Sequence, residues 1–242
     1  MTHSQRDLTH GVRVLFEDDA LMVVSKPSGM LVHRGWGDAE VVLVDVMREV
    51  VASDKVHTIH RLDRATSGAV IFAQTPTDAR TLNDMFDAGE VTKRYLTLVR
   101  GITPESGHID HPIPNKARGK ERVPAQSSFR RVAALRDTEP RALSLVEVRP
   151  HTGRVHQIRR HMRHINHHLI GDTTYGKGKL NRAIRDRYGL DRMALHALSL
   201  DFPHPRTGEP LRVVDPLADD FVEALRRMGL EVGAWAHGEM ER

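Results

Sequence analysis

The sequence predicts an α+β fold, with a mixed, mainly antiparallel central sheet flanked by helices and loops. Short apolar and β-branched runs recur along the chain, and helical segments follow them without the strict alternation of a doubly wound sheet. No linker-like stretch, low-complexity run or internal repeat interrupts the 242 residues. We therefore expect one compact domain at residues 12–229, with polar tails at 1–11 and 230–242.

Turn and cap residues bound the elements of the first half. Asp18-Asp19 forms a turn between two short strands, and Pro27-Ser28-Gly29 ends the second strand. Thr75 and Pro76 supply the cap and first turn of a helix that Gly89 closes. We also predict strands at 12–17, 21–26, 57–59, 69–74 and 93–99, an extended segment at 30–33 and a helix at 40–52.

The second half is richer in basic residues. We expect a polar, basic, mobile loop at 113–124, and a hairpin that turns at 137–140. Pro205-Arg206-Thr207-Gly208 marks a turn between two extended segments. The other predicted elements are hairpin strands at 126–134 and 142–149, helices at 156–165 and 180–188, a glycine-containing loop at 171–179, and a last helix from Asp215-Pro216 to Gly229.

Composition limits the classes of function. The chain has no cysteine, which excludes disulfides, thiolate metal sites and cysteine nucleophiles. Residues 1–11 are polar and unlike a secretory signal, and aliphatic runs such as 41–44 are too short to cross a membrane. We therefore expect a soluble, cytoplasmic protein.

Basic charge is concentrated in one part of the chain. Residues 113–213 hold 21 Lys and Arg against 9 Asp and Glu, a net charge of +12, whereas the rest carries −8. This excess predicts a polyanion-binding face, and the alternative is an ordinary solvated surface. Aromatic residues make up only 5% of the chain, which favours contacts to the phosphates of a folded RNA over stacking on unpaired bases.

One short segment carries a candidate catalytic carboxylate. The string HRLDRATSG at 60–68 places Asp63 between Arg61 and Arg64, in a loop expected between two strands. Neighbouring positive charge favours the ionised carboxylate, which suits a nucleophile or an electrostatic partner better than a general acid. From chemistry alone, a surface ion pair between Asp63 and the arginines is an equally good interpretation.

Several motifs spread between residues 12 and 213 together resemble the RluA group of pseudouridine synthases. They are VxKPxG at 24–29, HRLDxxTSG at 60–68, KxY at 93–95, TGRxHQxRxH at 152–161 and LHA…HP at 195–205. The resemblance implies a single pseudouridine synthase catalytic domain. The first motif begins near Val12, so we expect no N-terminal S4 RNA-binding domain of the kind found in many relatives.

The resemblance also implies roles for individual residues. Asp63 would be the catalytic residue and Arg159 its ion-pair partner, while Tyr95 would pack on the target base and take part in proton transfer. Without the resemblance, Tyr95 is better interpreted as a core aromatic of a strand. Arg61 would fill the space left by a flipped-out nucleotide. The expected substrate contacts are His60, Arg61 and Leu195, and the candidate phosphate contacts are Lys26, Lys93, Arg94, Arg154 and Arg160.

The implied reaction detaches uracil from its ribose, rotates it and rejoins it through C5. It needs no cofactor and no metal, and RNA is the expected partner. Shorter strings, HRGW at 33–36, RRH at 159–161 and RMALH at 192–196, resemble the subgroup that modifies tRNA, at a uridine in the stem of the T-arm. Ribosomal RNA is the alternative substrate, and a non-catalytic RNA-binding or RNA-folding protein is the alternative function. We expect a monomer.

Two further groups of residues could indicate a different chemistry, a zinc site and a hydrolytic triad. His161, His164 and His168 follow helical spacing, but a zinc site would need further ligands, so RNA contacts are the better interpretation. Ser67 with His60 and Asp63 has the composition of a hydrolytic triad, yet the segment lacks the elbow motif of such enzymes and Thr-Ser-Gly is ordinary turn chemistry. His168 also stands where the resembled family usually has proline, which affects only the local loop.

Overall fold

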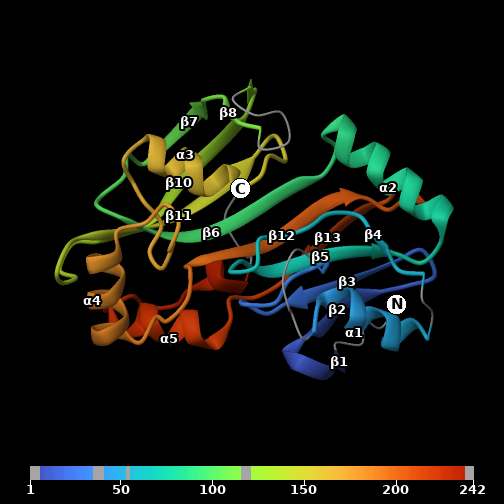
Figure 1. Cartoon of the computed structure of the whole chain (residues 1–242), viewed down its shortest axis with the longest axis horizontal. Helices are drawn as coiled ribbons and strands as arrows, with labels where there is room; N and C mark the ends of the chain where they lie inside the picture. Colours follow the sequence, from blue (N-terminus) through green and yellow to red (C-terminus); the bar gives the residue numbers. More distant parts are fainter. Residues whose placement is uncertain (1–5, 35–40, 53–54, 116–120, 238–242) are drawn as a thin grey trace. The chain divides into compact units, whose positions relative to one another are not determined.

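The computed structural model describes residues 6–34, 41–52, 55–115 and 121–237. Gly35 and Trp36 of the HRGW string, and residues 116–120 of the predicted basic loop, lie outside the described residues. The chain forms two compact units, unit 1 from Met1–Thr92 and Ala197–Pro216 and unit 2 from Lys93–His196 and Leu217–Arg242. The predicted α+β class, with a mixed sheet flanked by helices, is confirmed (Figure 1).

Unit 1 is built on strands in the order β1-β2-β3-β5-β12, with β4 beside β5 and β13 beside β12. The pairs β2–β3, β3–β5 and β12–β13 are antiparallel. The elements are β1 (Arg6–Asp7), η1 (Thr9–Gly11), β2 (Arg13–Glu17), β3 (Leu21–Lys26), α1 (Leu43–Val51), β4 (His57–Thr58), β5 (Ser67–Ala73), α2 (Pro76–Ala88), β12 (Leu195–Pro203) and β13 (Pro210–Val214).

The core of unit 1 forms because alternate strand residues point to the same side of the sheet. Ala69, Ile71 and Ala73 of β5 are buried together with Leu82 of α2. The helix begins where the Thr75 hydroxyl accepts the Asp78 N–H at 3.2 Å, and it ends at Gly89 in the left-handed conformation. Both ends of α2 are thus capped as the sequence predicts.

Unit 2 contains the antiparallel strand order β6-β11-β10-β7 and the short pair β8–β9. Helix α3 packs against β11, and α4 packs against α5. The elements are β6 (Thr92–Arg100), β7 (Ser106–Asp110), β8 (Ile113–Pro114), β9 (Arg122–Val123), β10 (Gln126–Leu135), β11 (Leu143–Pro150), α3 (Gln157–His164), α4 (Gly178–Tyr188), α5 (Asp219–Arg227) and η3 (Ala234–His237).

Most predicted elements are confirmed within a few residues, and three regions differ. Residues 6–11, expected in a polar tail, include β1, which pairs with β2. The described ends of the predicted mobile loop at 113–124 form the pair β8–β9. The last helix begins at Asp219 instead of Asp215, because the buried Asp215 accepts a hydrogen bond from Arg13 at 3.1 Å and donates its N–H to Leu198.

None of the described helices combines the length and the apolar character that crossing a lipid bilayer requires.

Candidate functional site

The loop that carries Asp63 joins β4 to β5 in unit 1 and is held by an adjacent loop. Asp63 is half-buried, and its carbonyl accepts the Thr66 N–H at 3.0 Å, which closes a turn. The Ser28 hydroxyl donates to the Ala65 carbonyl at 2.9 Å. Gly29 donates its N–H to the Arg64 carbonyl at 2.8 Å and accepts from Arg64 Nε at 2.9 Å. The VxKPxG and HRLDxxTSG motifs therefore form one hydrogen-bonded assembly around Asp63.

Lys26 lies inside this assembly. Its side chain is 0% exposed, and its ammonium donates to the carbonyls of Pro27 at 2.9 Å, Met30 at 2.8 Å and Arg64 at 3.3 Å. Three carbonyl acceptors satisfy the three donors of an ammonium. The expectation that Lys26 contacts RNA phosphate is therefore not met in this structure, since its charge holds the two loops together.

Gly68 fixes the end of the same motif. Its φ of +122° is unfavourable for any other residue, and a Cβ added there would lie 2.4 Å from the Ala197 carbonyl oxygen. β5, which begins at Ser67, can therefore approach Ala197 of β12 this closely only because residue 68 has no side chain. The Thr-Ser-Gly ending provides this close backbone approach in addition to the turn that the sequence indicates.

His60 and Arg61 differ in their surroundings. The Ile71 N–H donates to His60 Nε2 at 3.2 Å, so this nitrogen is an acceptor, and the ring stacks on Phe86 with centroids 5.1 Å apart. Arg61 is exposed. The pKa of His33 is lowered below its ordinary value, mainly by partial burial and to a smaller extent by the charges of Arg61 and Arg48. Arg61 is thus accessible, whereas His60 also has a structural role.

The KxY motif lies in β6 of unit 2. Tyr95 is half-buried and stands opposite Val148 of β11. Burial lowers the pKa of the half-buried Lys93. Leu195, expected as a substrate contact, is 3% exposed in this structure. The strand therefore offers partly accessible side chains at Lys93, Arg94 and Tyr95.

The TGRxHQ motif supports the start of α3. Gln157 accepts hydrogen bonds at Oε1 from the Thr152 hydroxyl at 2.6 Å and the Arg154 N–H at 3.0 Å. Its amide nitrogen donates to the Gln126 carbonyl at 2.8 Å. His156, immediately before the helix, has a left-handed backbone with φ 55°. The glutamine thus joins the motif to β10, while Arg154 remains exposed.

Arg159 projects from α3 into a buried bidentate ion pair. Its Nε and Nη2 donate to Oδ2 and Oδ1 of Asp172 at 2.8 and 2.9 Å. The side chains are 8% and 1% exposed. The predicted pairing of Arg159 with Asp63 stays a prediction, because the two residues belong to different units.

Asp172 also accepts two backbone hydrogen bonds, from Thr174 at 2.8 Å and Tyr175 at 2.9 Å. Burial alone would raise the pKa of this carboxyl, but the hydrogen bonds and the Arg159 charge lower it below the ordinary value. The Tyr175 hydroxyl then bonds His156 Nδ1 at 3.0 Å and Arg160 Nε at 2.9 Å. Asp172 and Tyr175 therefore organise the basic helix.

Asp172 and Tyr175 are site residues that the sequence does not predict. They lie in the predicted glycine-containing loop, and no motif in the string GDTTYG indicates contact with the helix that precedes it. Arg163 and Arg122 stand out in the sequence only as basic residues. A charged pair of complementary geometry, Arg on the helix and Asp in the loop, is the one signal that could have suggested the contact.

Only two of the three spaced histidines lie on α3, which ends at His164. His161 is 0% exposed and bonds the Ser127 hydroxyl at 2.9 Å, whereas His164 stacks on His111 and His168 lies beyond the end of α3. Within the described residues, no three His, Asp or Glu side chains gather in a way that could hold a metal ion. Ser67, considered for a triad, is 2% exposed in β5.

Comparisons with known proteins agree on one family. The family model described as RNA pseudouridylate synthase matches residues 20–164. "tRNA pseudouridine synthase C" of Haemophilus ducreyi is 38% identical over 216 residues, covering 83% of this chain and 88% of that protein. The protein of the same name from Haemophilus influenzae is 34% identical over 238 residues, covering 91% and 99%.

Two solved human structures are similar in fold. "RNA Pseudouridylate Synthase Domain Containing 4" has a TM-score of 0.75 and 25% sequence identity, and the match covers 90% of this chain and 94% of that chain. "RNA Pseudouridylate Synthase Domain Containing 1" has a TM-score of 0.69 and 26% identity, covering 84% and 82%.

Proposed function

Because the chain belongs to the RNA pseudouridylate synthase family, we propose that this pseudouridine synthase modifies a specific uridine of tRNA and that Asp63 is its catalytic residue. The observation that carries the choice of tRNA is the similarity, over most of both chains, to proteins named tRNA pseudouridine synthase C. A purely RNA-binding function, one alternative from the sequence, does not account for the family membership.

The reaction is an isomerisation, because the same base is reattached to the same ribose and no atom is gained or lost overall. The bond between N1 of uracil and C1′ of ribose breaks, the base turns, and a bond forms between C5 and C1′. The hydrogen on C5 leaves as a proton, and N1 gains a proton. The target nucleotide must leave the base stack, because the glycosidic carbon is inaccessible inside a helix.

Asp63 suits the first step because hydrogen bonds hold the loop that carries it. The bonds from Ser28, Gly29 and Lys26 hold the residues on its C-terminal side, Arg64 and Ala65. A rigid loop on a sheet keeps a reacting group aligned. Asp63 would act as nucleophile or base, by attack on the sugar, attack on the base, or elimination to a glycal.

We assign the other residues supporting roles. Arg159 would pair with Asp63, Tyr95 would contact the base, and the exposed Arg61 would occupy the space left by the extruded nucleotide. Lys26 holds the loop instead of binding phosphate. The remaining proposed substrate contacts are His60, Leu195, Lys93, Arg94, Arg154 and Arg160.

The proposed target is a uridine in the stem of the T-arm, and a ribosomal RNA uridine is the alternative. The proposal further includes action as a monomer in the cytoplasm without metal or cofactor. Light scattering during size-exclusion chromatography tests the oligomeric state.

Release of tritium tests the proposal. With tRNA that carries tritium at C5 of uridine, the wild-type protein should release the label to water as the new carbon–carbon bond forms. Asp63→Asn keeps the size of the side chain but removes the carboxylate, so release should fall by at least about 10²–10⁴-fold. RNA binding should be retained.

Asp87→Asn is the matched control, because Asp87 is an exposed carboxylate on α2 of the same unit. This variant should release tritium as the wild type does. Normal turnover by Asp63→Asn would remove Asp63 from its proposed role. Release from ribosomal RNA alone would contradict the choice of tRNA, and no release from either RNA despite binding would overturn the function.

A further inference from the structure

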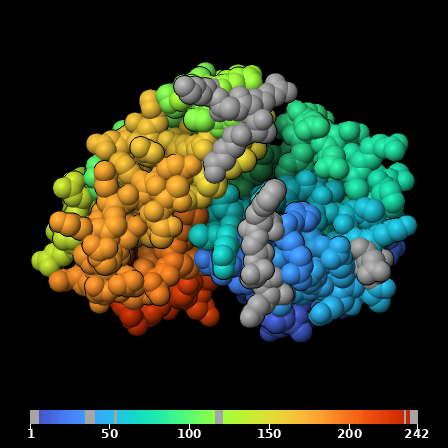
Figure 2. Space-filling view, viewed as in Figure 1, coloured from blue at the N-terminus to red at the C-terminus, as the bar shows by residue number. Residues whose placement is uncertain are grey.

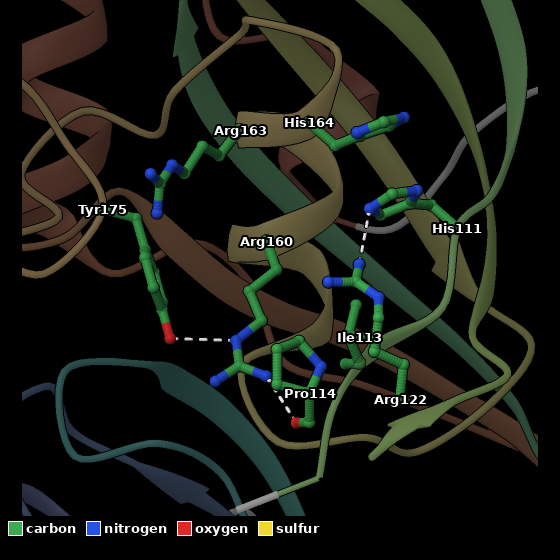
Figure 3. Close-up of a pocket in the computed structure, with 8 residues that line it drawn as sticks. All are labelled: His111, Ile113, Pro114, Arg122, Arg160, Arg163, His164 and Tyr175. Atoms are coloured by element: carbon green, nitrogen blue, oxygen red, sulfur yellow. Dashed lines mark hydrogen bonds between the residues drawn. The ribbon is translucent and has the colours of Figure 1, made fainter. Parts of the chain in front are cut away.

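Unit 2 contains a pocket of about 340 Å³ beside the basic helix α3 (Figure 3). This volume lies in the range of small-ligand pockets. α3 contributes three lining residues, β8 and β9 contribute three, and two more come from the segments at 111 and 175. The lining residues are His111, Ile113, Pro114, Arg122, Arg160, Arg163, His164 and Tyr175.

The pocket concentrates positive charge. Arg160 donates to the Tyr175 hydroxyl at 2.9 Å and to the Pro114 carbonyl at 2.9 Å, while Arg163 lies over the Tyr175 ring at 5.7 Å. Arg122 bonds His111 Nε2 at 2.8 Å and the Pro112 carbonyl. Among the described residues, none that lines the pocket is acidic and none of the three guanidiniums has a carboxylate partner.

A histidine pair forms another wall. The rings of His111 and His164 stack with centroids 3.6 Å apart and an interplanar angle of 12°. Burial, and then the charges of His164 and Arg122, lower the pKa of His111. Burial and, after it, positive charge in the pocket disfavour a proton on His111, and a bound anion would relieve the charge repulsion.

The pocket is accessible from solvent. Arg122, Arg163 and His164 are exposed side chains, and Arg160 is half-buried. In Figure 2, α3 and α4 contribute to the part of the surface coloured yellow to orange. Arginine forks match phosphate oxygens, and exposed guanidiniums are common phosphate contacts. The exposed guanidiniums of Arg122 and Arg163 can therefore meet a phosphate of an RNA chain at the protein surface.

We propose that this pocket binds a backbone phosphate of the RNA substrate, with the attached nucleotide filling the remaining volume. Neither Asp63 nor Tyr95 lines the pocket, so the nucleotide it takes is one other than the target uridine. The site would anchor the RNA while the target base reacts. This inference rests on the proposed function, because that function makes RNA the substrate.

Binding of unfractionated bacterial tRNA at several salt concentrations tests the anchor. The double variant R122Q/R163Q removes two pocket charges and leaves Arg160 in place. Its Kd should rise about tenfold or more at fixed salt, and the slope of log Kd against log salt should fall by about one for each phosphate that the variant no longer binds. In tritium release, the effect should appear mainly in KM.

Arg226→Gln is the matched control, because it removes an exposed charge of the same unit from α5, far from α3 in Figure 1. It should change Kd by less than about twofold, as for an uninvolved surface charge. Unchanged far-ultraviolet circular dichroism establishes that the double variant is folded. A folded double variant with wild-type Kd and salt slope overturns the proposal.

Ring signals of His111 and His164 in NMR spectra distinguish the source of the phosphate. They should shift with tRNA at concentrations where inorganic phosphate and uridine monophosphate have no effect. A shift with either small anion, combined with wild-type tRNA binding by the double variant, would assign the pocket to a free metabolite and contradict the proposal. If the wild type binds tRNA but releases no tritium, the proposed function fails while the anchor is still tested.

Discussion

At the scale of single residues, the ion pair of Arg159 and Asp172 in the proposed site is both buried and bidentate. Two parallel hydrogen bonds strengthen the pair, but both charges lose their hydration. The N–H groups of Thr174 and Tyr175 compensate part of that loss at the carboxylate. Removal of one partner would therefore leave a buried, uncompensated charge.

Asp172→Asn tests this account. The amide nearly preserves the shape of the carboxylate but cannot accept from Arg159 with both terminal atoms. We expect the free energy of unfolding at pH 7 to fall by about 3–5 kcal/mol, measured by urea denaturation. Asp186→Asn, at an exposed carboxylate of α4, should change it by less than about 1 kcal/mol. Equal effects of the two substitutions would refute the account.

Site residues differ in how far the sequence could predict them. Asp63 stands inside a motif, so a local string is enough to select it. Lys26 also stands in a motif, but its burial depends on three carbonyls, one of them from Arg64. A lysine that binds phosphate and a lysine that holds a loop have the same local sequence, and only the packing separates them.

At the scale of elements, the N-terminus of α2 is joined to the turn between β12 and β13. Arg206 Nε and Nη2 donate to the two carboxylate oxygens of Asp78, each at 2.8 Å, and Thr75 donates to the same carboxylate at 2.6 Å. The Arg206 bonds and the Thr75 bond outweigh the opposing effect of burial and lower the pKa of Asp78 to about 2. Helix and hairpin are thus held together by an ionised carboxylate.

This coupling predicts an acid-sensitive contribution to stability. Because the folded pKa is below the unfolded one, the contribution is complete above about pH 4 and is lost as the pH falls toward 2. Asp78→Asn should lower the free energy of unfolding by about 1–2 kcal/mol at pH 7 and by little near pH 2. Urea denaturation as a function of pH measures both.

Asp84→Asn, at an exposed position of the same helix, is the control and should leave the pH profile unchanged. An Asp78→Asn profile parallel to that of the wild type between pH 4 and 2 would rule out the coupling.

Elements with strong local signals were predictable. α2 has a threonine cap, an early proline and a terminal glycine, and each acts within one turn of the helix. The start of α5 was predicted wrongly, because Asp215-Pro216 resembles a cap and first turn. In the structure the Asp215 carboxylate instead accepts a hydrogen bond from Arg13, which lies 202 positions away in the sequence. Tertiary pairing overrides the local signal there.

At the scale of the whole molecule, charge is distributed unevenly along the chain. The +12 segment at 113–213 includes all of α3 and the arginines of the pocket, whereas the remainder is acidic. Electrostatic attraction to phosphate is independent of base sequence. Charge thus accounts for RNA binding, whereas selection of the target uridine requires contacts that depend on the bases or the shape of the RNA.

The choice of RNA is a property of the whole protein and is tested in cells. Mapping of pseudouridines with and without the intact gene should reveal loss at one uridine in the T-arm stem of tRNA. Re-expression of the wild-type protein should restore the site, and Asp63→Asn should not. Loss confined to ribosomal RNA would contradict the proposed substrate.

The family, the fold class and the Asp63 loop followed from the sequence alone, because ordered motifs and local turn, cap and strand signals survive without knowledge of contacts. The bidentate partner of Arg159, the burial of Lys26 and the pocket beside α3 did not. Each depends on residues separated in the chain that meet only after packing, such as Arg122 and Arg163. Hydrogen-bond geometry and burial, which set the charge state and reach of a side chain, exist only in the folded structure.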